Sequence, residues 1–408
     1  MDDLIRKALR SKPYENLHDM ANKTCQKPVK HPVIKDTPLS IRCGQAEVFF
    51  LKSKNGDPKI LKVFYSNKLP GESYLRAISS VLPKQKAFIC GLERQVLSSS
   101  SLNSHQGYHT KALSNFLDNA VLMPQVPGQD WMSLIDEIRG KTVHLSDKQR
   151  RLIAFNLAAV TKAMEAGSIS HRDYSTGNIY IDFNNQSCQI YLIDLDCPYH
   201  PSLHMPANTT IGSDGYMAPF IDLNDASSTY CCMADRFALT VLCVEFLILN
   251  PISPLVHEGG IFEQKELFQR YGNTVSYARS ELKRTCPEAL DLFKRALTSH
   301  SFADCPSPDE WMVLCHVPGC CLTIAKTLMK GLTNDTIRTF SWCTYIRNTV
   351  YVHPYRPSGI SHVWKDRQYP CIRMRLNALH YKPCGYSIRA YGKRIDHRAY
   401  QANANSQK

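Results

Sequence analysis

The sequence contains no apolar segment long enough to cross a membrane. Its longest apolar run, Phe237 to Leu249, is interrupted by Glu245 and falls short of the roughly 20 residues that a membrane-spanning helix requires. Charged side chains are scattered through the first fifteen residues, where a secretion signal would be apolar. With 43% hydrophobic and 21% charged residues, the composition is globular rather than disordered. We therefore expect a folded protein without a membrane span, working in the cytoplasm.

Cysteine pairs of the Cys-x-x-Cys type are also missing. The 16 cysteines are scattered along the chain, so reduced thiols are expected rather than a disulfide framework. Cysteine and histidine are frequent after residue 314, but their spacing matches no zinc finger, so buried thiols are expected there before zinc. The residues concerned are Cys315, His316, Cys320, Cys321, Cys343, His353, His362, Cys371, His380 and Cys384.

Acidic residues are rare in the last quarter of the chain. The whole chain has 49 Lys+Arg against 36 Asp+Glu, a net charge of +13. Residues 316–408 hold 15 of these basic residues but only three acids, so residues 1–315 are nearly neutral. This change in charge composition predicts a separate basic, aromatic-rich extension at 316–408. It is compatible with a cap on the main domain, with contact to an acidic protein or membrane surface, or, with less support, with nucleic-acid binding.

Hydrophobic periodicity predicts a strand-rich part followed by a helix-rich part. After an N-terminal extension at 1–37, strands are expected at about 41–51 and 60–65 and a second hairpin at 179–193. Helical spacing is found at 74–82, at 92–97, at 148–166 and almost throughout 219–314. We therefore expect an α+β fold.

The strongest motif is His171-Arg172-Asp173 with Asn178 five positions later, followed by Asp194-Leu-Asp196 at the end of the second hairpin. Phosphoryl transfer uses one carboxylate to take the proton of the attacking hydroxyl. A second carboxylate and an amide oxygen hold Mg²⁺ on the phosphates. An Asp and an Asn at this spacing alone would be an ordinary polar loop. The His-Arg pair, the hairpin and the second acid together favour a phosphotransfer site.

Six segments of the chain, in the order in which the family has them, resemble the eukaryotic-type protein kinase family. Besides the two above, 60–62 is similar to its third strand, 123–130 to the hinge, 212–219 to the substrate-positioning segment and 235–239 to the start of the central buried helix. The resemblance covers about 40 to 314. It implies a kinase-like domain at 38–315, with a β-rich N-lobe at about 38–123 and a helical C-lobe at about 127–315.

The resemblance also implies a role for each matching residue. Asp173 would be the catalytic base, Asn178 and Asp194 would bind Mg²⁺ or Mn²⁺, and Lys62 would bind the ATP phosphates. Arg172 would contact a phosphate on the activation segment, for which the candidates are Thr209, Thr210 and Ser213. Further nucleotide-binding positions would be Gly44, Val48, Met123, Gln125 and Asp130.

In this family a glutamate pairs with the phosphate-binding lysine. Glu93 is the favoured partner for Lys62, because it fits a helix and lies 30 residues before Met123. The alternative, Glu72, follows Lys62 by only ten residues, which leaves little room for a strand end, a loop and two helical turns.

The sequence departs from the family pattern at several positions. Only Gly44 remains of the glycines that let backbone approach the phosphates. Ser175 replaces a lysine common in Ser/Thr kinases, and Asp196 replaces a glycine, where it would bind a second metal ion or be solvated. Phe220 and Cys305 replace the two partners of a buried ion pair, so we expect them to lie in contact.

We therefore expect an ATP-dependent Ser/Thr protein kinase that uses Mg²⁺ or Mn²⁺ and a protein substrate. Two alternatives remain open. Ser175 and Asp196 indicate a small-molecule kinase of the same fold. The segment 212–219 argues against this alternative, because it resembles the substrate-positioning segment of protein kinases. The single-glycine loop indicates a kinase-like scaffold that binds partners through its basic extension. A scaffold would have no need to retain Lys62, Asp173, Asn178 and Asp194.

Overall fold

The computed structural model describes nine parts of the chain: residues 18–19, 24–29, 39–53, 58–65, 70–97, 120–184, 187–206, 210–254 and 260–317. Most of the N-terminal extension, Thr209 and everything after Val317 lie outside the described residues. The predictions for the basic extension and for zinc fall there, except that Cys315 and His316 are described. Those predictions and the domain boundaries therefore stay predictions.

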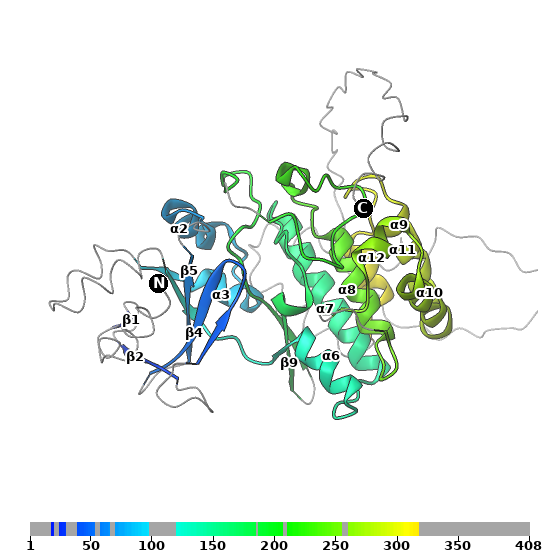
Figure 1. Ribbon diagram of the computed structural model, residues 1–408, viewed down its shortest axis with the longest axis horizontal. Helices are drawn as coiled ribbons and strands as arrows, with labels where there is room; N and C mark the ends of the chain where they lie inside the picture. The colour runs from blue at the N-terminus through cyan, green and yellow to red at the C-terminus, as the bar shows by residue number, and fades with distance from the viewer. Residues whose placement is uncertain are drawn as a thin grey trace, which may run out of the picture. The chain divides into compact units, whose positions relative to one another are not determined.

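An antiparallel sheet forms the N-terminal part of the described structure (Figure 1). Its strand order is β1-β2-β4-β5-β7-β6, with β3 paired to β4. The expected first hairpin is confirmed, since β4 and β5 pair along their length with Val48 opposite Lys62. The strands are β1 (His18–Asp19), β2 (Thr24–Pro28), β3 (Ser40–Arg42), β4 (Ala46–Ser53), β5 (Lys59–Phe64), β6 (Gln95–Val96) and β7 (Val121–Pro124).

Two helices and a 3₁₀ turn lie between β5 and β6. The expected helix at 74–82 is confirmed as α2 (Glu72–Val81), which buries Tyr74, Leu75 and Ile78. The 3₁₀ turn η2 (Lys86–Phe88) leads into α3 (Ile89–Leu92). The helix expected at 92–97 is wrong, because α3 ends at Leu92 and Val96 pairs with Val121 of β7. Sheet pairing and burial of Val96 override a short helical pattern at this position.

Helices dominate the described residues between 131 and 317. They are α6 (Trp131–Arg139), α7 (Asp147–Ala166), α8 (Arg236–Ile248), α9 (Gln264–Gln269), α10 (Asn273–Thr285), α11 (Pro287–Thr298) and α12 (Pro308–Leu314), with the 3₁₀ turns η3 (Thr176–Asn178) and η4 (Ala226–Thr229). Ser146 and Gln149 form a capping box that starts α7. Nearly every residue of α8 is buried, as its apolar sequence predicts. A sheet-containing N-terminal region and a helical region are thus both present.

The expected second hairpin is also confirmed. Strands β9 (Ile179–Asn184) and β10 (Ser187–Leu192) pair with Ile181 opposite Ile190, and the short β8 (Gln129–Asp130) extends this sheet along β9. Gly128, just before β8, has a φ of 86°, and a Cβ there would lie 2.3 Å from the carbonyl oxygen of Ile181. Only glycine therefore lets the 124–130 connection approach the hairpin so closely.

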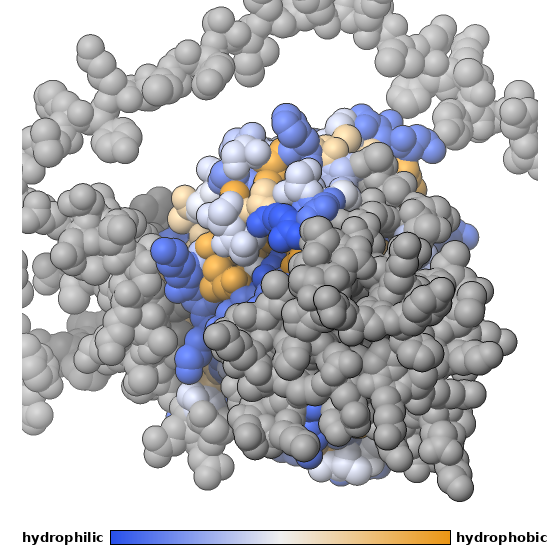
Figure 2. Space-filling view, turned by 90° about the vertical axis from the view of Figure 1, so that its left-hand side faces the viewer, coloured by the Kyte–Doolittle hydropathy of each residue, from blue (hydrophilic) through white to orange (hydrophobic). Residues whose placement is uncertain are grey.

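Exposed apolar side chains are scattered over the described residues. In the space-filling view, hydrophilic and apolar residues are interspersed on the described face (Figure 2). The large exposed apolar side chains come from separate segments of the chain and include Ile41, Met205, Leu223, Ile252 and Tyr271. Isolated exposed residues of this kind are usual on globular proteins. None of the described helices combines the length and the apolar character that a membrane span demands.

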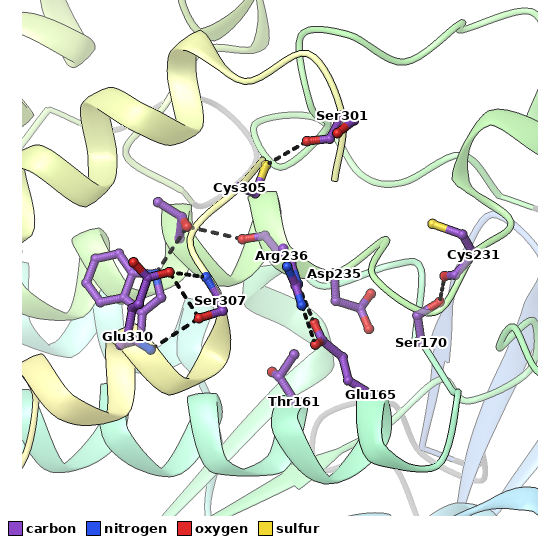
Figure 3. A network of polar contacts seen from close by, with 12 residues as sticks. Thr161, Glu165, Ser170, Cys231, Asp235, Arg236, Ser301, Cys305, Ser307 and Glu310 are labelled. Carbon is purple, nitrogen blue, oxygen red and sulfur yellow. Dashed lines mark hydrogen bonds and ion pairs between the residues drawn. The ribbon is translucent and has the colours of Figure 1, made fainter. Parts of the chain in front are cut away.

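A polar network ties α8 to its neighbours (Figure 3). Arg236 at the start of α8 donates two hydrogen bonds of 2.8 Å to the carboxylate of Glu165 on α7, and both side chains are 16% exposed. Cys305 lies in the same region, where its thiol contacts the carbonyl oxygen of Ser301. Phe220 packs edge to face on Phe302, with ring centroids 4.9 Å apart. The contact expected between Phe220 and Cys305 stays a prediction.

The bidentate pair between Arg236 and Glu165 should contribute measurably to stability. Glu165→Gln leaves a mostly buried guanidinium without its counter-ion, so we expect the free energy of unfolding in urea to fall by about 2 kcal/mol. The double variant Glu165→Gln with Arg236→Gln should lose less than the sum of the single losses. Glu72→Gln, which removes an exposed pair with Arg76, is the control and should leave stability unchanged. Equal losses in Glu165→Gln and Glu72→Gln would contradict this assignment.

Candidate active site

The loop that begins at His171 is fixed by one buried carboxylate. Asp235 precedes α8, and its side chain accepts hydrogen bonds from the backbone N–H groups of His171 (2.6 Å) and Arg172 (2.7 Å). Burial raises the pKa of Asp235 to about 6, although both backbone hydrogen bonds favour the carboxylate. The contact joins the loop to α8, which is the most completely buried of the described helices.

Arg172 has a strained backbone and an extensively bonded side chain. Its φ is 69°, in the left-handed region that arginine rarely adopts, and the bonds to Asp235 hold it there. The guanidinium donates to four carbonyl oxygens from three separate segments and lies 4.9 Å from the ring centroid of Tyr230. The acceptors are the carbonyls of Cys197, Thr210, Ala226 and Thr229. Arg172 thus contacts Thr210, and the pairing of Arg172 with a phosphate on this segment stays a prediction.

Asp173 lies where the loop at 171–178 meets the segment 212–219. Its Oδ1 accepts a hydrogen bond of 2.6 Å from the hydroxyl of Ser213, which belongs to the segment 212–219. Asn178 donates from Nδ2 to the carbonyl oxygen of Asp173 at 2.8 Å and lies 3.4 Å from its Oδ2. The structure therefore brings the expected base and the expected metal ligand together. Ser213, predicted only as a candidate phosphate acceptor, donates to Asp173 directly, and its modification stays a prediction.

Asp194 follows the second hairpin and lies next to the loop at 171–178. The N–H of Ile193 donates to the carbonyl oxygen of Asn178 at 3.1 Å, and His171 Nε2 lies 2.8 Å from the carbonyl oxygen of Ile193. Asp194 follows with a φ of 58°, a conformation that aspartate tolerates better than most residues. The loop at 171–178 and the acids at 194 and 196 therefore form one bonded unit.

Lys62 of β5 joins this unit through two carboxylates. Its Nζ lies 2.5 Å from Asp194 Oδ1 and 2.5 Å from Asp196 Oδ2. The second oxygen of Asp196 faces Arg94, whose Nη1 is 3.1 Å away in a buried ion pair. Asp194 keeps a third of its side chain exposed, whereas the side chains of Asp196 and Arg94 are each 2% exposed. The positive charges of Lys62 and Arg94 thus balance the negative charges of Asp194 and Asp196.

The pKa shifts follow this charge arrangement. Burial alone favours neutral Lys62, but Asp194 and Asp196 raise the pKa of Lys62 above its usual value. Burial also opposes the charge on Asp196, yet Lys62 and then Arg94 hold the pKa of Asp196 well below its usual range. Burial and the neighbouring Asp196 raise the pKa of Asp194, against the opposing effect of Lys62. Lys62 and Asp196 therefore form a charged pair at neutral pH.

The glutamate expected to pair with Lys62 is not its partner. Glu93 is exposed, one residue beyond the end of α3, and it forms no ion pair with Lys62. Glu72 is also exposed and pairs with Arg76 one helical turn away. The expected helix at 92–97 is absent, and the chain buries Arg94 instead of Glu93. Arg94 was not identified from sequence, and only the extra acid at 196 pointed to an additional cation.

The remaining nucleotide-binding candidates lie along the sheet and the connection to α6. Val48 is opposite Lys62 on the neighbouring strand, so both side chains share one face of the sheet. Met123 is buried on β7, opposite Ile60. Gly44 lies in the bend between β3 and β4, and Gln125 is exposed. Asp130 caps α6, where its carboxylate accepts from the N–H and the hydroxyl of Ser133. The nucleotide roles of these residues stay predictions.

The donor set suits a hard divalent cation. Asn178 uses its amide nitrogen on Asp173, which leaves the amide oxygen, and Asp194 is partly exposed beside it. Mg²⁺ is commonly held by one or two carboxylates together with phosphate oxygens and water. Within the described residues no group of three or more His, Cys, Asp or Glu side chains forms a dedicated metal cage. Asp196 directs both oxygens at cations and is buried, so neither expectation for it, metal ligand or solvated acid, fits its surroundings.

The segment 212–219 is hydrogen-bonded to two side chains of the helical region, Gln264 and Glu245. Gln264, at the start of α9, accepts from the N–H groups of Gly215 (2.9 Å) and Met217 (3.1 Å) and donates to the Met217 carbonyl (2.8 Å). Tyr216 donates to the buried carboxylate of Glu245 at 3.1 Å. The segment that supplies Ser213 to Asp173 is thereby fixed to the helical region.

Comparison with known proteins supports a relationship to protein kinases. The chain is 27% identical, over 183 residues, to the liver/testis isoform of the phosphorylase b kinase gamma catalytic chain from Mus musculus. The match covers 41% of this chain and 44% of that protein, which is less than half of the relative's length. No protein-family model matches the chain.

Glu245 should make stability depend on pH. It accepts hydrogen bonds from Trp131, Tyr216 and the N–H of Ile261, and burial raises the pKa of Glu245 to about 7 from an ordinary 4.5. The folded state therefore binds the proton more tightly, and this contribution to stability is lost as the pH rises from about 4.5 to about 7. Relative to wild type, Glu245→Gln should gain on the order of 3 kcal/mol in the free energy of unfolding across that range.

Urea denaturation of both proteins at pH 5 and pH 7.5 measures this difference. Glu72→Gln, an exposed glutamate, is the matched control and should follow the wild type at both pH values. A difference between Glu245→Gln and wild type that stays constant with pH would contradict the assignment.

Proposed function

We propose that the chain is an ATP-dependent phosphotransferase, a Ser/Thr protein kinase that transfers the γ-phosphoryl group of ATP to a protein hydroxyl. The observation that carries the proposal is the meeting of Asp173, Asn178, Asp194 and Lys62 in one bonded unit. This combination of base, metal ligands and phosphate-binding lysine is what phosphoryl transfer requires. The likeness to a kinase catalytic chain agrees with it.

Each residue has a distinct role in the proposed reaction. Lys62 binds phosphate oxygens of ATP, and Asp173 orients the acceptor hydroxyl and takes its proton. The bond from the acceptor oxygen to the γ-phosphorus forms while the bond from that phosphorus to the bridging oxygen of ADP breaks. Asn178 and Asp194 would hold Mg²⁺ or Mn²⁺, which neutralises charge on the phosphates. Ser175, at the position of the missing lysine, provides no positive charge for the transferred group.

A protein acceptor is supported by the segment 212–219. Ser213 of this segment donates to the proposed base, Asp173, and Gln264 and Glu245 hydrogen-bond other residues of the segment. A rigid backbone beside the base can orient an extended polypeptide so that its hydroxyl reaches Asp173. The supported segment 212–219 therefore favours a protein acceptor over a small free substrate.

Removal of the base should abolish transfer without unfolding the protein. We expect Asp173→Ala to lower the rate of phosphate transfer to casein, and of autophosphorylation, by roughly 10²- to 10⁴-fold with either Mg²⁺ or Mn²⁺. Lys62→Met should also inactivate the enzyme through loss of ATP binding. Asp136→Asn, an exposed acid on α6, is the control and should retain activity. Undiminished transfer by Asp173→Ala would contradict the mechanism, and silence of the wild type would favour a kinase-like scaffold.

Gln264 should affect the protein acceptor and not ATP. Gln264→Ala removes three hydrogen bonds to the segment 212–219, so we expect the KM for casein to rise by up to about tenfold. The KM for ATP and the slow hydrolysis of ATP by water should not change. Gln269→Ala, exposed at the other end of α9, is the matched control. Equal effects on both substrates would contradict a role specific to the acceptor.

A further inference from the structure

We infer that Asp196 and Arg94 position Lys62, in place of the glutamate that performs this task in protein kinases. The inference rests on the proposed function, because it names how the ATP-binding lysine of that site is held. Asp196 supplies the carboxylate, and Arg94 holds that carboxylate from its other side. In this chain the acid that aligns Lys62 belongs to the segment following β10 and not to a helix beside the sheet.

The contacts of Asp196 divide between two cations. Oδ2 accepts from Lys62 Nζ at 2.5 Å, and Oδ1 lies 3.1 Å from Arg94 Nη1. The carboxylate is therefore fixed in orientation by a cation on either side. Asp194 also contacts Lys62, but it is partly exposed and is the proposed metal ligand. When Asp194 takes up a metal ion, Asp196 remains as the anion that keeps Lys62 in place.

Burial argues that the pair serves positioning rather than stability. Moving an arginine and an aspartate out of water is costly, and replacing such pairs with apolar residues is often neutral or stabilising. The Nε and Nη1 groups of Arg94 and the Oδ1 of Asp196 also have no well-aligned hydrogen bond among the described residues. An imperfectly bonded, buried pair next to Lys62 is what a positioning role would retain.

The acid that holds Lys62 comes from outside the helices between β5 and β6. In protein kinases, control of the helix that carries the glutamate controls the lysine. Here Glu72, the first residue of α2, and Glu93, just after α3, are exposed and form no ion pair with Lys62. The acid partner of Lys62 therefore does not belong to α2, although the hydroxyl of Tyr74 on α2 donates to the carbonyl oxygen of Pro198 in the same segment as Asp196.

The affinity of the full-length protein for a fluorescent ATP analogue tests the inference, with and without Mg²⁺. Asp196→Asn should weaken binding by about 10- to 100-fold, as loss of a supporting partner does at other sites. Arg94→Met should weaken it about tenfold, and Arg94→Lys should restore most of the affinity. The double variant Asp196→Asn with Arg94→Met should bind no more weakly than Asp196→Asn alone, because Arg94 acts through Asp196. Glu93→Gln should bind within about twofold of wild type.

Several outcomes would overturn the inference. It fails if Glu93→Gln weakens binding while Asp196→Asn does not, or if the losses of Asp196→Asn and Arg94→Met multiply. It also fails if the wild type binds no nucleotide. Unfolding temperatures of all variants exclude loss of fold as the cause, and Arg94→Lys and Asp196→Asn decide the question if Arg94→Met does not fold. A wild type that binds nucleotide but transfers no phosphate would reject the proposed function and leave this inference standing.

Discussion

The carboxylate of Asp235 is the contact on which the candidate site depends. It fixes the backbone of His171 and Arg172 to α8, and this holds the left-handed conformation of Arg172. His171 in turn contacts the carbonyl of Ile193, and the next residue, Asp194, contacts Lys62. An unbroken series of hydrogen bonds and ion pairs therefore runs from the most buried helix to the N-terminal sheet. Because each link fixes the next, the site is arranged before any substrate binds.

The charges of the site are balanced differently from what the family resemblance implies. Asp196, in place of a glycine, adds a buried negative charge, and Arg94 supplies the opposite charge on its far side. A buried carboxylate facing only one lysine, itself shared with Asp194, would leave a net negative charge in a poorly solvated site. The substitution at 196 and the burial of Arg94 are therefore understood as one change. By the family resemblance, Phe220 and Cys305 would likewise replace both partners of an ion pair at once.

Local motifs allowed the residues of the candidate site to be predicted, whereas their long-range partners did not follow from sequence. Both hairpins, α2, α7 and the buried α8 were predicted from periodicity, and Asp173, Asn178, Asp194 and Lys62 do meet. The partner of Lys62 was predicted wrongly, because a helix ending one turn earlier exposes Glu93 and buries Arg94. The roles of Ser213 and Gln264 were also missed. Their contacts join segments 40 or more residues apart, and no local pattern indicates them.

The most direct test is a crystal structure of the protein with a non-hydrolysable ATP analogue and Mg²⁺. The account predicts that Lys62 contacts the phosphates while remaining paired with Asp196, that Arg94 keeps its contact with Asp196, and that Asp194 and Asn178 bind the metal ion. A structure in which Lys62 leaves Asp196 and pairs with Glu93, or in which the nucleotide lies away from Lys62, would contradict it.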